Sequence, residues 1–435
     1  MKGKRDNKPR VVILCRSDLS GGAAVVSLRL TEALNAAGVE ARMLVAEKLS
    51  DSPLVVKATG ETSVKKSFLT ERLKIFIANG FDRDTLFKID TGDCGLPLWH
   101  HPLVKEADVV MLNWINQGFL SLQGVRKIMA LGKPVIWTMH DLWCMTGICH
   151  HPYTCTRFHG ECGDCPLLGK KASPHDLSHR IWEKKRATYD SDTENPITFV
   201  AVSNWLAAHA RESKLLRDRR IEVIPNTLPQ IETDFTAERT GRKKKPVILF
   251  GAARLDDPIK GFGDFIRMTE ILKERYPDVA KNLEILTFGS IKDETLLGRL
   301  ALPHRHSGML HGDEAITEAY RQGDILVTTS AYETLPTMPV EAQLFGCIPV
   351  SYDSGGQPDI IDHLSTGYLA EKDSDPEKAA SNLAQGVAWA VGRINSEEYP
   401  DMLMKMRRNM KERFSSGPVI SKYMQLIEEL LDRQQ

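Results

Sequence analysis

The sequence predicts an α/β protein with two doubly wound domains, each built on a parallel sheet. Its length of 435 residues exceeds the usual size of one domain, so two domains are expected. Short apolar runs alternate with longer segments of helical periodicity in each half of the chain, which is the pattern of βα units. A polar segment between the halves, with a basic run at 242–245, interrupts this alternation and is typical of a linker.

The first predicted domain covers residues 1–228. A buried strand at 11–15 leads through a turn at Gly21 and Gly22 into an amphipathic helix. Further strands are expected at 41–46, 108–114, 134–140, 197–203 and 222–225. Because these strands alternate with helical segments, the first half of the chain should form one doubly wound domain.

The second predicted domain covers residues 246–414 and follows a linker at 229–245. Its clearest element is a βαβ unit, with strands at 324–330 and 348–353 and a helix between them. In an open parallel sheet, ligands bind beside the carboxyl ends of the strands. The loops that follow these two strands are therefore expected to carry a binding site.

Two glutamates flank the start of the helix in this unit. The neighbouring prolines suit a loop and a first helical turn but not a helix interior, so Glu333 should lie in the loop and Glu341 within the helix. The backbone amides near Thr337 and Met338 would then face an anion at the helix N-terminus. The segment is a candidate site for a sugar phosphate.

The residue order around these glutamates resembles that of the retaining glycosyltransferases with the GT-B fold, in particular the family 4 group. The family signature is a pair of glutamates with seven residues between them, which Glu333 and Glu341 match. The more specific part of the resemblance is the surrounding order of Ser330, Glu333, Pro336, Glu341, Ala342, Gly346, Pro349, Gly355, Gly356 and Pro358. The resemblance implies two Rossmann-like domains that face an interdomain cleft, with a C-terminal helix at 415–435 packed back on the first domain.

The resemblance also implies an activity. A hexose-like sugar would move from a UDP- or GDP-linked donor to a glycan or lipid-linked acceptor in polysaccharide biosynthesis, such as capsule or exopolysaccharide assembly, and the anomeric configuration would be kept. Glu341 would hold the ribose hydroxyls, while Glu333 and the amides of Thr337 and Met338 would contact the sugar and the diphosphate. No residue stands out as a covalent nucleophile, so the departing phosphate oxygen is expected to accept the proton of the acceptor. No cofactor is implied for catalysis.

Two cations of the second domain match the family pattern. Arg254 and Lys260 follow a strand and precede Gly261 and a helix. Positive charge at this place would stabilise the departing nucleoside diphosphate as the glycosidic bond lengthens. The alternative is a solvated surface pair beside Asp256 and Asp257.

The first domain contributes three further residues through the resemblance. Gly21 and Gly22 would let a phosphate or acceptor approach the backbone, although a tight turn without a ligand explains them almost as well. His140 ends an apolar strand and would touch an outer hydroxyl of the sugar, whereas a core histidine is the alternative. Asn113 stands where a histidine is common in the family, so the acceptor side departs from the pattern.

Two other classes of protein stay open. One is a different GT-B enzyme, either a sugar-nucleotide epimerase that converts the donor alone or a phosphorylase that requires inorganic phosphate. The other is a non-catalytic, transferase-like subunit that binds a partner. The joint presence of the catalytic candidates argues against a degenerate enzyme; they are His140, Arg254, Lys260, Glu333 and Glu341.

Four of the eight cysteines lie in one short segment. They are Cys149, Cys155, Cys162 and Cys165. Thiolates at this density suit a structural, tetrahedral zinc ion that would order a loop near the acceptor, and a branch of the family has a similar insertion. The spacing is not that of a standard zinc finger, so free thiols, a disulfide pair and an iron–sulfur site stay open. His150, His151 and His159 are substitute ligands, and Cys144 is a fifth thiol.

Composition excludes some partners. The 57 Lys and Arg residues balance 57 Asp and Glu residues, so nothing in the net charge favours nucleic acid. No apolar run approaches the roughly 20 residues that cross a bilayer. The basic start at 1–10 lacks the apolar region of a signal peptide, and a cytoplasmic protein is expected.

One segment of the first domain is a candidate for membrane contact. Residues 64–81 combine the cations Lys65, Lys66, Arg72 and Lys74 with apolar side chains at helical spacing. Such a helix can rest on an anionic membrane where a lipid-linked acceptor is found. A surface helix that packs its apolar side on the sheet is the alternative.

Overall fold

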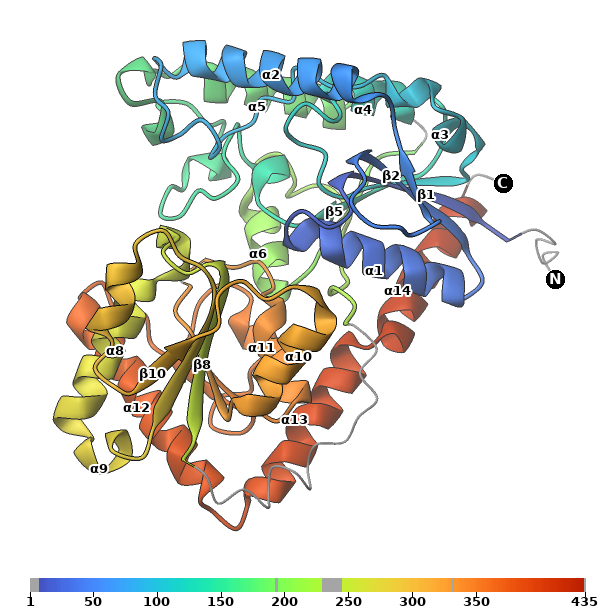
Figure 1. Cartoon of the computed structure of the whole chain (residues 1–435). Helices are drawn as coiled ribbons and strands as arrows, with labels where there is room; N and C mark the ends of the chain where they lie inside the picture. The colour runs from blue at the N-terminus through green and yellow to red at the C-terminus, as the bar shows by residue number, and fades with distance from the viewer. Residues whose placement is uncertain (1–7, 192–194, 229–244, 331, 434–435) are drawn as a thin grey trace. The chain divides into compact units, whose positions relative to one another are not determined.

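The computed structural model describes residues 8–191, 195–228, 245–330 and 332–433. The chain forms two compact units, coloured along the chain in Figure 1. Unit 1 comprises Met1–Thr227 and Ser416–Gln435, and unit 2 comprises Leu228–Ser415. The predicted linker at 229–245 lies outside the described residues except for its last residue, Lys245.

Unit 1 is built on a seven-stranded parallel sheet of order β3-β2-β1-β4-β5-β6-β7. The strands are β1 (Arg10–Ser17), β2 (Glu40–Glu47), β3 (Val55–Lys57), β4 (Val109–Leu112), β5 (Val135–Met139), β6 (Thr198–Ala201) and β7 (Ile221–Val223). The helices are α1 (Gly22–Ala36), α2 (Glu61–Ala78), α3 (Pro102–Glu106), α4 (Leu122–Met129), α5 (Leu177–Tyr189), α6 (Asn204–Glu212) and α14 (Ser416–Asp432). The strand order changes direction between β1 and β4, which is where doubly wound folds bind ligands.

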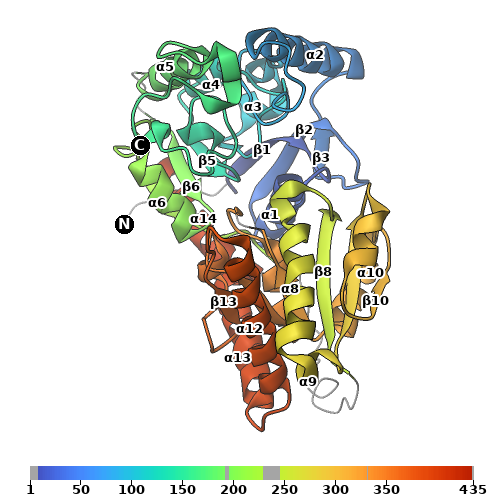
Figure 2. The ribbon, with the colours of Figure 1, turned by 90° about the vertical axis from the view of Figure 1, so that its left-hand side faces the viewer.

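Helices α1 and α14 lie together on one face of this sheet, while α4 and α5 lie on the other (Figures 1 and 2). Helices α1 and α14 pack on the sheet through apolar side chains. One buried cluster contains Leu34 of α1, Leu426 and Ile427 of α14, and Ile13 of β1. The last helix of the chain is therefore part of the core of unit 1.

Unit 2 is built on a six-stranded parallel sheet of order β10-β9-β8-β11-β12-β13. The strands are β8 (Val247–Arg254), β9 (Glu284–Ser290), β10 (His304–His306), β11 (Ile325–Thr328), β12 (Ile348–Tyr352) and β13 (Tyr368–Ala370). The helices are α8 (Phe262–Arg275), α9 (Pro277–Ala280), α10 (Gly312–Gln322), α11 (Thr337–Leu344), α12 (Pro376–Ile394) and α13 (Tyr399–Phe414).

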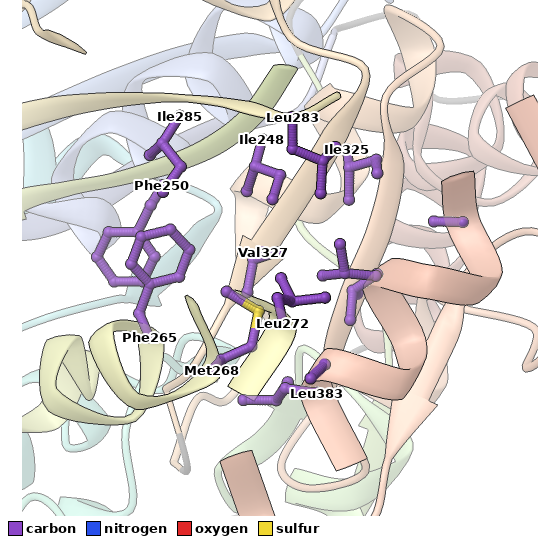
Figure 3. Packing of buried hydrophobic residues seen from close by; sticks show 14 of the residues in the cluster. Ile248, Phe250, Phe265, Met268, Leu272, Leu283, Ile285, Ile325, Val327 and Leu383 are labelled. Carbon is purple, nitrogen blue, oxygen red and sulfur yellow. The ribbon is translucent and has the colours of Figure 1, made fainter. Parts of the chain in front are cut away.

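The sheet of unit 2 is buried on both faces. Ile248 and Phe250 of β8 point into a cluster with residues of α8 and α12, part of which Figure 3 shows. The intervening Leu249 points to the opposite face and packs with Tyr320 and Phe345. Parallel strands covered on both sides have apolar residues in succession rather than in alternation, which is the pattern of this strand. Both units are Rossmann-like, so the predicted fold class is confirmed.

Short 3₁₀ turns complete the described structure. They are η1 (Leu98–His100), η2 (Trp143–Met145), η3 (Arg157–His159), η4 (Pro166–Lys171), η5 (Pro258–Lys260), η6 (Glu294–Arg299) and η7 (Gln357–Asp359). Between β5 and α5 the chain contains three of these turns and one isolated bridge, between Ile89 and Cys149. None of the described helices is both long enough and apolar enough to cross a lipid bilayer.

Candidate functional site

The loops at the carboxyl ends of β8 and β11 bring Lys260 and Glu333 together. The ammonium of Lys260 donates to a carboxylate oxygen of Glu333 at 2.6 Å. Both side chains are partly exposed, at 33% and 23%, so a ligand in solvent can reach the pair. The structure thus unites two of the predicted site residues, which are 73 positions apart in the sequence.

The position of Lys260 is fixed by the backbone around it. The hydroxyl of Thr329, directly after β11, lies 2.6 Å from the carbonyl oxygen of Lys260 and 2.8 Å from that of Gly261. Gly261 has a φ of 67° and caps α8, and a Cβ atom there would lie 2.5 Å from the carbonyl oxygen of Thr329. Glycine is required because any side chain would push the two loops apart.

Gly355 and Gly356 likewise lie close to the backbone of the loop that carries Glu333. A Cβ atom on Gly355 would lie 2.4 Å from the carbonyl oxygen of Glu333, and one on Gly356 would lie 2.2 Å from that of Thr334. The amide of Gly356 donates to the carbonyl oxygen of Glu333 at 2.8 Å. The turn after β12 therefore lies directly against the backbone of the glutamate loop.

The structure places Glu333 in the loop before α11 and Glu341 inside that helix. Helix α11 begins at Thr337, its N-cap is Pro336, and no side chain among the described residues caps it. Its first amides, including that of Met338, are available to an anion beside the Lys260–Glu333 pair. The carboxylate of Glu341 accepts a hydrogen bond of 3.0 Å from the hydroxyl of Tyr320. Because Tyr320 is buried, this contact fixes the Glu341 side chain to the core.

Arg254 is placed differently from Lys260. Its guanidinium lies 3.4 Å from carboxylate oxygens of both Asp256 and Asp257. These are the surface partners that the sequence offered as the alternative to a phosphate site. Arg254 therefore faces its own loop.

In unit 1, Gly21 and Gly22 open helix α1. Gly21 has a φ of 91° and caps the helix without a side-chain hydrogen bond. A Cβ atom at either glycine would meet no atom within 4 Å among the described residues. Unlike Gly261, Gly355 and Gly356, these two glycines leave open space beside a helix N-terminus.

His140 and Asp141 follow β5. His140 is half-buried, and desolvation lowers its pKa to about 4 against the opposing effect of Asp141, so the ring is neutral at neutral pH. Asp141 accepts hydrogen bonds from the indole of Trp114 at 2.9 Å and from the amide of Trp143 at 2.8 Å. Burial opposes ionisation of Asp141, but His150, His151 and the amide of Trp143 hold its pKa well below the usual value.

Asp141 is part of a buried ionic network that was not predicted from the sequence. His150 lies between two carboxylates, 2.7 Å from Asp141 and 2.8 Å from Asp90, and Asp90 is also paired with Arg72. Burial lowers the pKa of His150, but the two carboxylates outweigh it and raise the pKa to about 10, so the imidazole is charged. Both ring nitrogens are occupied, so the prediction that His150 substitutes as a metal ligand was wrong.

The same network corrects the interpretation of residues 64–81. Arg72 was predicted as a surface cation, but its side chain is buried and is paired with Asp90. The neighbouring Glu71 is buried as well, and its carboxylate accepts from the amide of Gly92 at 3.0 Å. Residues 72, 90, 141 and 150 are too far apart in the sequence for any local pattern to have predicted their contact.

The four clustered cysteines line one cavity of unit 1. All eight cysteines are free thiols, so the structure contains no disulfide among the residues it describes. Cys144 is buried but is not among the residues that line this cavity. His159 lies 3.3 Å from Glu212, outside the cavity lining.

Several solved structures have the same fold as this chain. HepE of Anabaena in complex with UDP-glucose is 13% identical, with a TM-score of 0.56 over 96% of this chain and 99% of its own. A glycosyltransferase of Rickettsia africae is 14% identical, with a TM-score of 0.60 over 98% and 99%. Sucrose-phosphate synthase of Thermosynechococcus elongatus is 15% identical, with a TM-score of 0.58 over 98% and 100%. These similarities define the fold as GT-B.

Family models define the class more closely. The model described as Glycosyl transferases group 1 matches residues 232–388, and the one described as Glycosyltransferase Family 4 matches residues 20–229. The two matches cover most of the chain between them. A comparison with curated protein sequences gives no match. The protein is a GT-B glycosyltransferase, and the chain belongs to the family 4 group.

Proposed function

We propose that this glycosyltransferase moves a hexose-like sugar from a nucleoside-diphosphate donor to an acceptor hydroxyl and keeps the anomeric configuration. The observation that carries the proposal is the Lys260–Glu333 pair beside the uncapped N-terminus of α11. A cation, a carboxylate and helix amides at one sheet edge provide the charges that a sugar diphosphate requires.

Each group has a distinct role in this proposal. When the donor binds, the ammonium of Lys260 leaves Glu333 and contacts a phosphate oxygen of the donor. The carboxylate of Glu333 is then free to accept hydrogen bonds from the sugar. The amides of Thr337 and Met338 bind the diphosphate, and Arg254 turns from its two aspartates to the same anion. Glu341, held by Tyr320, accepts hydrogen bonds from the ribose hydroxyls. The positive groups stabilise charge that develops on the leaving diphosphate.

A UDP-linked donor is supported by HepE, whose structure holds UDP-glucose. None of the groups in this site is placed as a nucleophile, so the proposed route is the front-face one, in which the leaving phosphate oxygen takes the proton of the acceptor. The proposed chemistry requires no cofactor. The roles of His140, Gly21 and Gly22 stay predictions from the resemblance.

A panel of UDP- and GDP-sugars, followed by release of free nucleoside diphosphate, tests the proposal. One donor should be turned over slowly without an acceptor, and Glu333→Ala should abolish the release. Lys281→Ala is the matched control, because Lys281 forms an equally short ion pair of 2.6 Å with Asp278 on an exposed surface. Turnover that survives in Glu333→Ala would contradict the assigned site, and turnover of no donor would favour a binding subunit.

We also propose that α2 rests on an anionic membrane that carries a lipid-linked acceptor. Leu69, Leu73 and Ile77 recur every fourth residue and are 62%, 58% and 55% exposed, so this apolar row does not pack on the sheet. Lys65 and Lys66 are exposed on the same helix. An exposed apolar row with adjacent lysines is the composition of an interfacial helix.

Co-sedimentation with vesicles tests the membrane contact. The protein should bind vesicles that contain anionic phospholipid and lose binding when Leu69, Leu73 and Ile77 are all replaced by serine. Replacement of the exposed Met404, on α13, by serine is the control. Equal sedimentation of both variants would contradict the proposal.

A further inference from the structure

The segment between β5 and α5 has an unusual internal organisation. Its regular structure is limited to short 3₁₀ turns and one isolated bridge at Cys149, yet most of residues 142–150 are buried. Its four clustered cysteines line a single cavity of about 20 Å³. That volume holds one water-sized occupant, so it is far too small for a sugar or a nucleotide. A single ion fits among the four thiols.

The donor set selects the kind of ion. Cys149, Cys155, Cys162 and Cys165 offer four soft sulfur ligands, and four thiolates in a closed structural site favour tetrahedral zinc. Calcium and magnesium require oxygen ligands and are excluded by this chemistry. The remaining cysteines do not line the cavity.

Groups next to the thiols suit the charge of such a site. Four thiolates around Zn²⁺ leave a net negative charge, which nearby donors must stabilise. The amide of Gly147 already donates to the sulfur of Cys162 at 3.2 Å. Lys185 is fully buried, and its side chain donates to the carbonyl oxygens of Trp143 and Thr146. The amide of Gly147 would compensate part of the charge on the sulfur that it contacts.

The turn between the last two cysteines is also strained. Cys162, Gly163 and Asp164 all have positive φ, at 40°, 137° and 44°. A Cβ atom on Gly163 would lie 2.5 Å from the carbonyl oxygen of Pro174. Consecutive left-handed residues persist only where other interactions fix them. A metal bound by the cysteines on both sides of this turn would supply that constraint.

We propose that Cys149, Cys155, Cys162 and Cys165 bind one structural Zn²⁺ ion. Each thiol loses its proton to solvent as the Zn–S bond forms, with no change of oxidation state. Among the described residues, no three Cys, His, Asp or Glu side chains already stand in ligand geometry. Binding therefore requires the thiols to move from the positions that the structure records.

The position of the site indicates what the metal does. Cys149 is adjacent to His150, whose ring holds Asp141 at 2.7 Å, and Asp141 follows His140. At the other end, the amide of Cys165 donates to Asp176, the N-cap of α5, at 2.8 Å. The zinc would thus fix both ends of the segment and hold the His140 loop in place without touching a substrate.

Metal analysis of the full-length protein, purified under reducing conditions, tests the proposal. One zinc per chain is expected, with loss of most of it in Cys155→Ser and in Cys162→Ser. Cys94→Ser is the control, because Cys94 is a half-buried thiol outside the cavity lining. Zinc retained in the double variant of Cys155 and Cys162, or iron in place of zinc, would overturn the proposal.

Cobalt substitution tests the same site in the wild-type protein, so it does not depend on whether a cysteine variant folds. Wild-type protein stripped of metal and supplied with Co²⁺ should show the intense absorption of tetrahedral cobalt thiolate. Absence of that spectrum, with all four thiols titratable in the folded protein, would overturn the proposal. A cysteine pair found oxidised in the freshly purified protein would overturn it as well.

Discussion

At the scale of single residues, the ammonium of Lys260 and the carboxylate of Glu333 form an ion pair with each other. Their contact of 2.6 Å lies at a partly exposed position, where an ion pair contributes little to stability. The pair is therefore better explained by binding than by folding. In the proposed mechanism, an anion of the donor takes the place of the Glu333 carboxylate beside Lys260, and until then the contact holds the two side chains together.

Replacement of Lys260 by alanine should reduce donor turnover by about 100-fold, because one charge that stabilises the leaving diphosphate is lost. The free energy of unfolding should change little, since the lysine is partly exposed. Steady-state release of nucleoside diphosphate and urea unfolding measure the two effects. Wild-type turnover in this variant, or a loss of turnover equal to that of Lys281→Ala, would contradict the role of Lys260.

Glu71 provides a prediction about pH. Burial, and then the neighbouring Asp90, raise its pKa from 4.5 to about 7. In the unfolded chain the carboxyl ionises near its ordinary value, so the folded state is favoured at low pH and loses stability as pH rises from about 4.5 to about 7. A shift of this size corresponds to roughly 3 kcal/mol.

In Glu71→Gln this loss of stability between pH 5 and pH 8 should largely disappear, because the amide does not ionise. The variant should be more stable than wild type at pH 8 and similar to it at pH 5. Glu61→Gln, on the exposed start of the same helix, should keep the wild-type dependence. Urea unfolding at pH 5 and pH 8 measures the free energy of unfolding of each variant. An equal loss of stability between these pH values in wild type and Glu71→Gln would show that Glu71 is not its cause.

At the scale of elements, three glycines of unit 2 set the distance between neighbouring loops. Gly261 lies against Thr329, and Gly355 and Gly356 lie against the backbone at Glu333 and Thr334. These turns could be expected from the sequence because glycine after a strand is a local signal. What each glycine touches depends on the strand order, so the sequence did not show it.

Gly356→Ala should lower donor turnover and cost about 1–3 kcal/mol of stability, because the new methyl group must displace the loop of Glu333. Gly263→Ala is the matched control: Gly263 lies in α8 and a Cβ atom there meets nothing within 4 Å among the described residues. Alanine is the better helix former, so the control should be neutral or slightly stabilised. The measurements are thermal unfolding and nucleotide release, and equal behaviour of the two variants would rule out this packing role.

At the scale of the whole molecule, the sequence was sufficient for the fold class and the family. Apolar strands in regular alternation with helices predict parallel sheets, and a spaced residue pattern around Glu333 indicates the family. The ionic network around His150 could not be predicted, because it joins side chains from separate loops. His150 next to Cys149 looked like a metal ligand, and Arg72 among lysines looked like a surface cation, since neighbours in sequence were the only guide.

The proposed reaction breaks the bond between the anomeric carbon of the sugar and the diphosphate of the donor, and it keeps the anomeric configuration. Time-resolved proton NMR of the protein with the preferred UDP-sugar tests it most directly. From an α-linked donor, the α-anomer of the released sugar should form first, together with free UDP. First release of the β-anomer, or conversion of the donor into a different UDP-sugar, would contradict it.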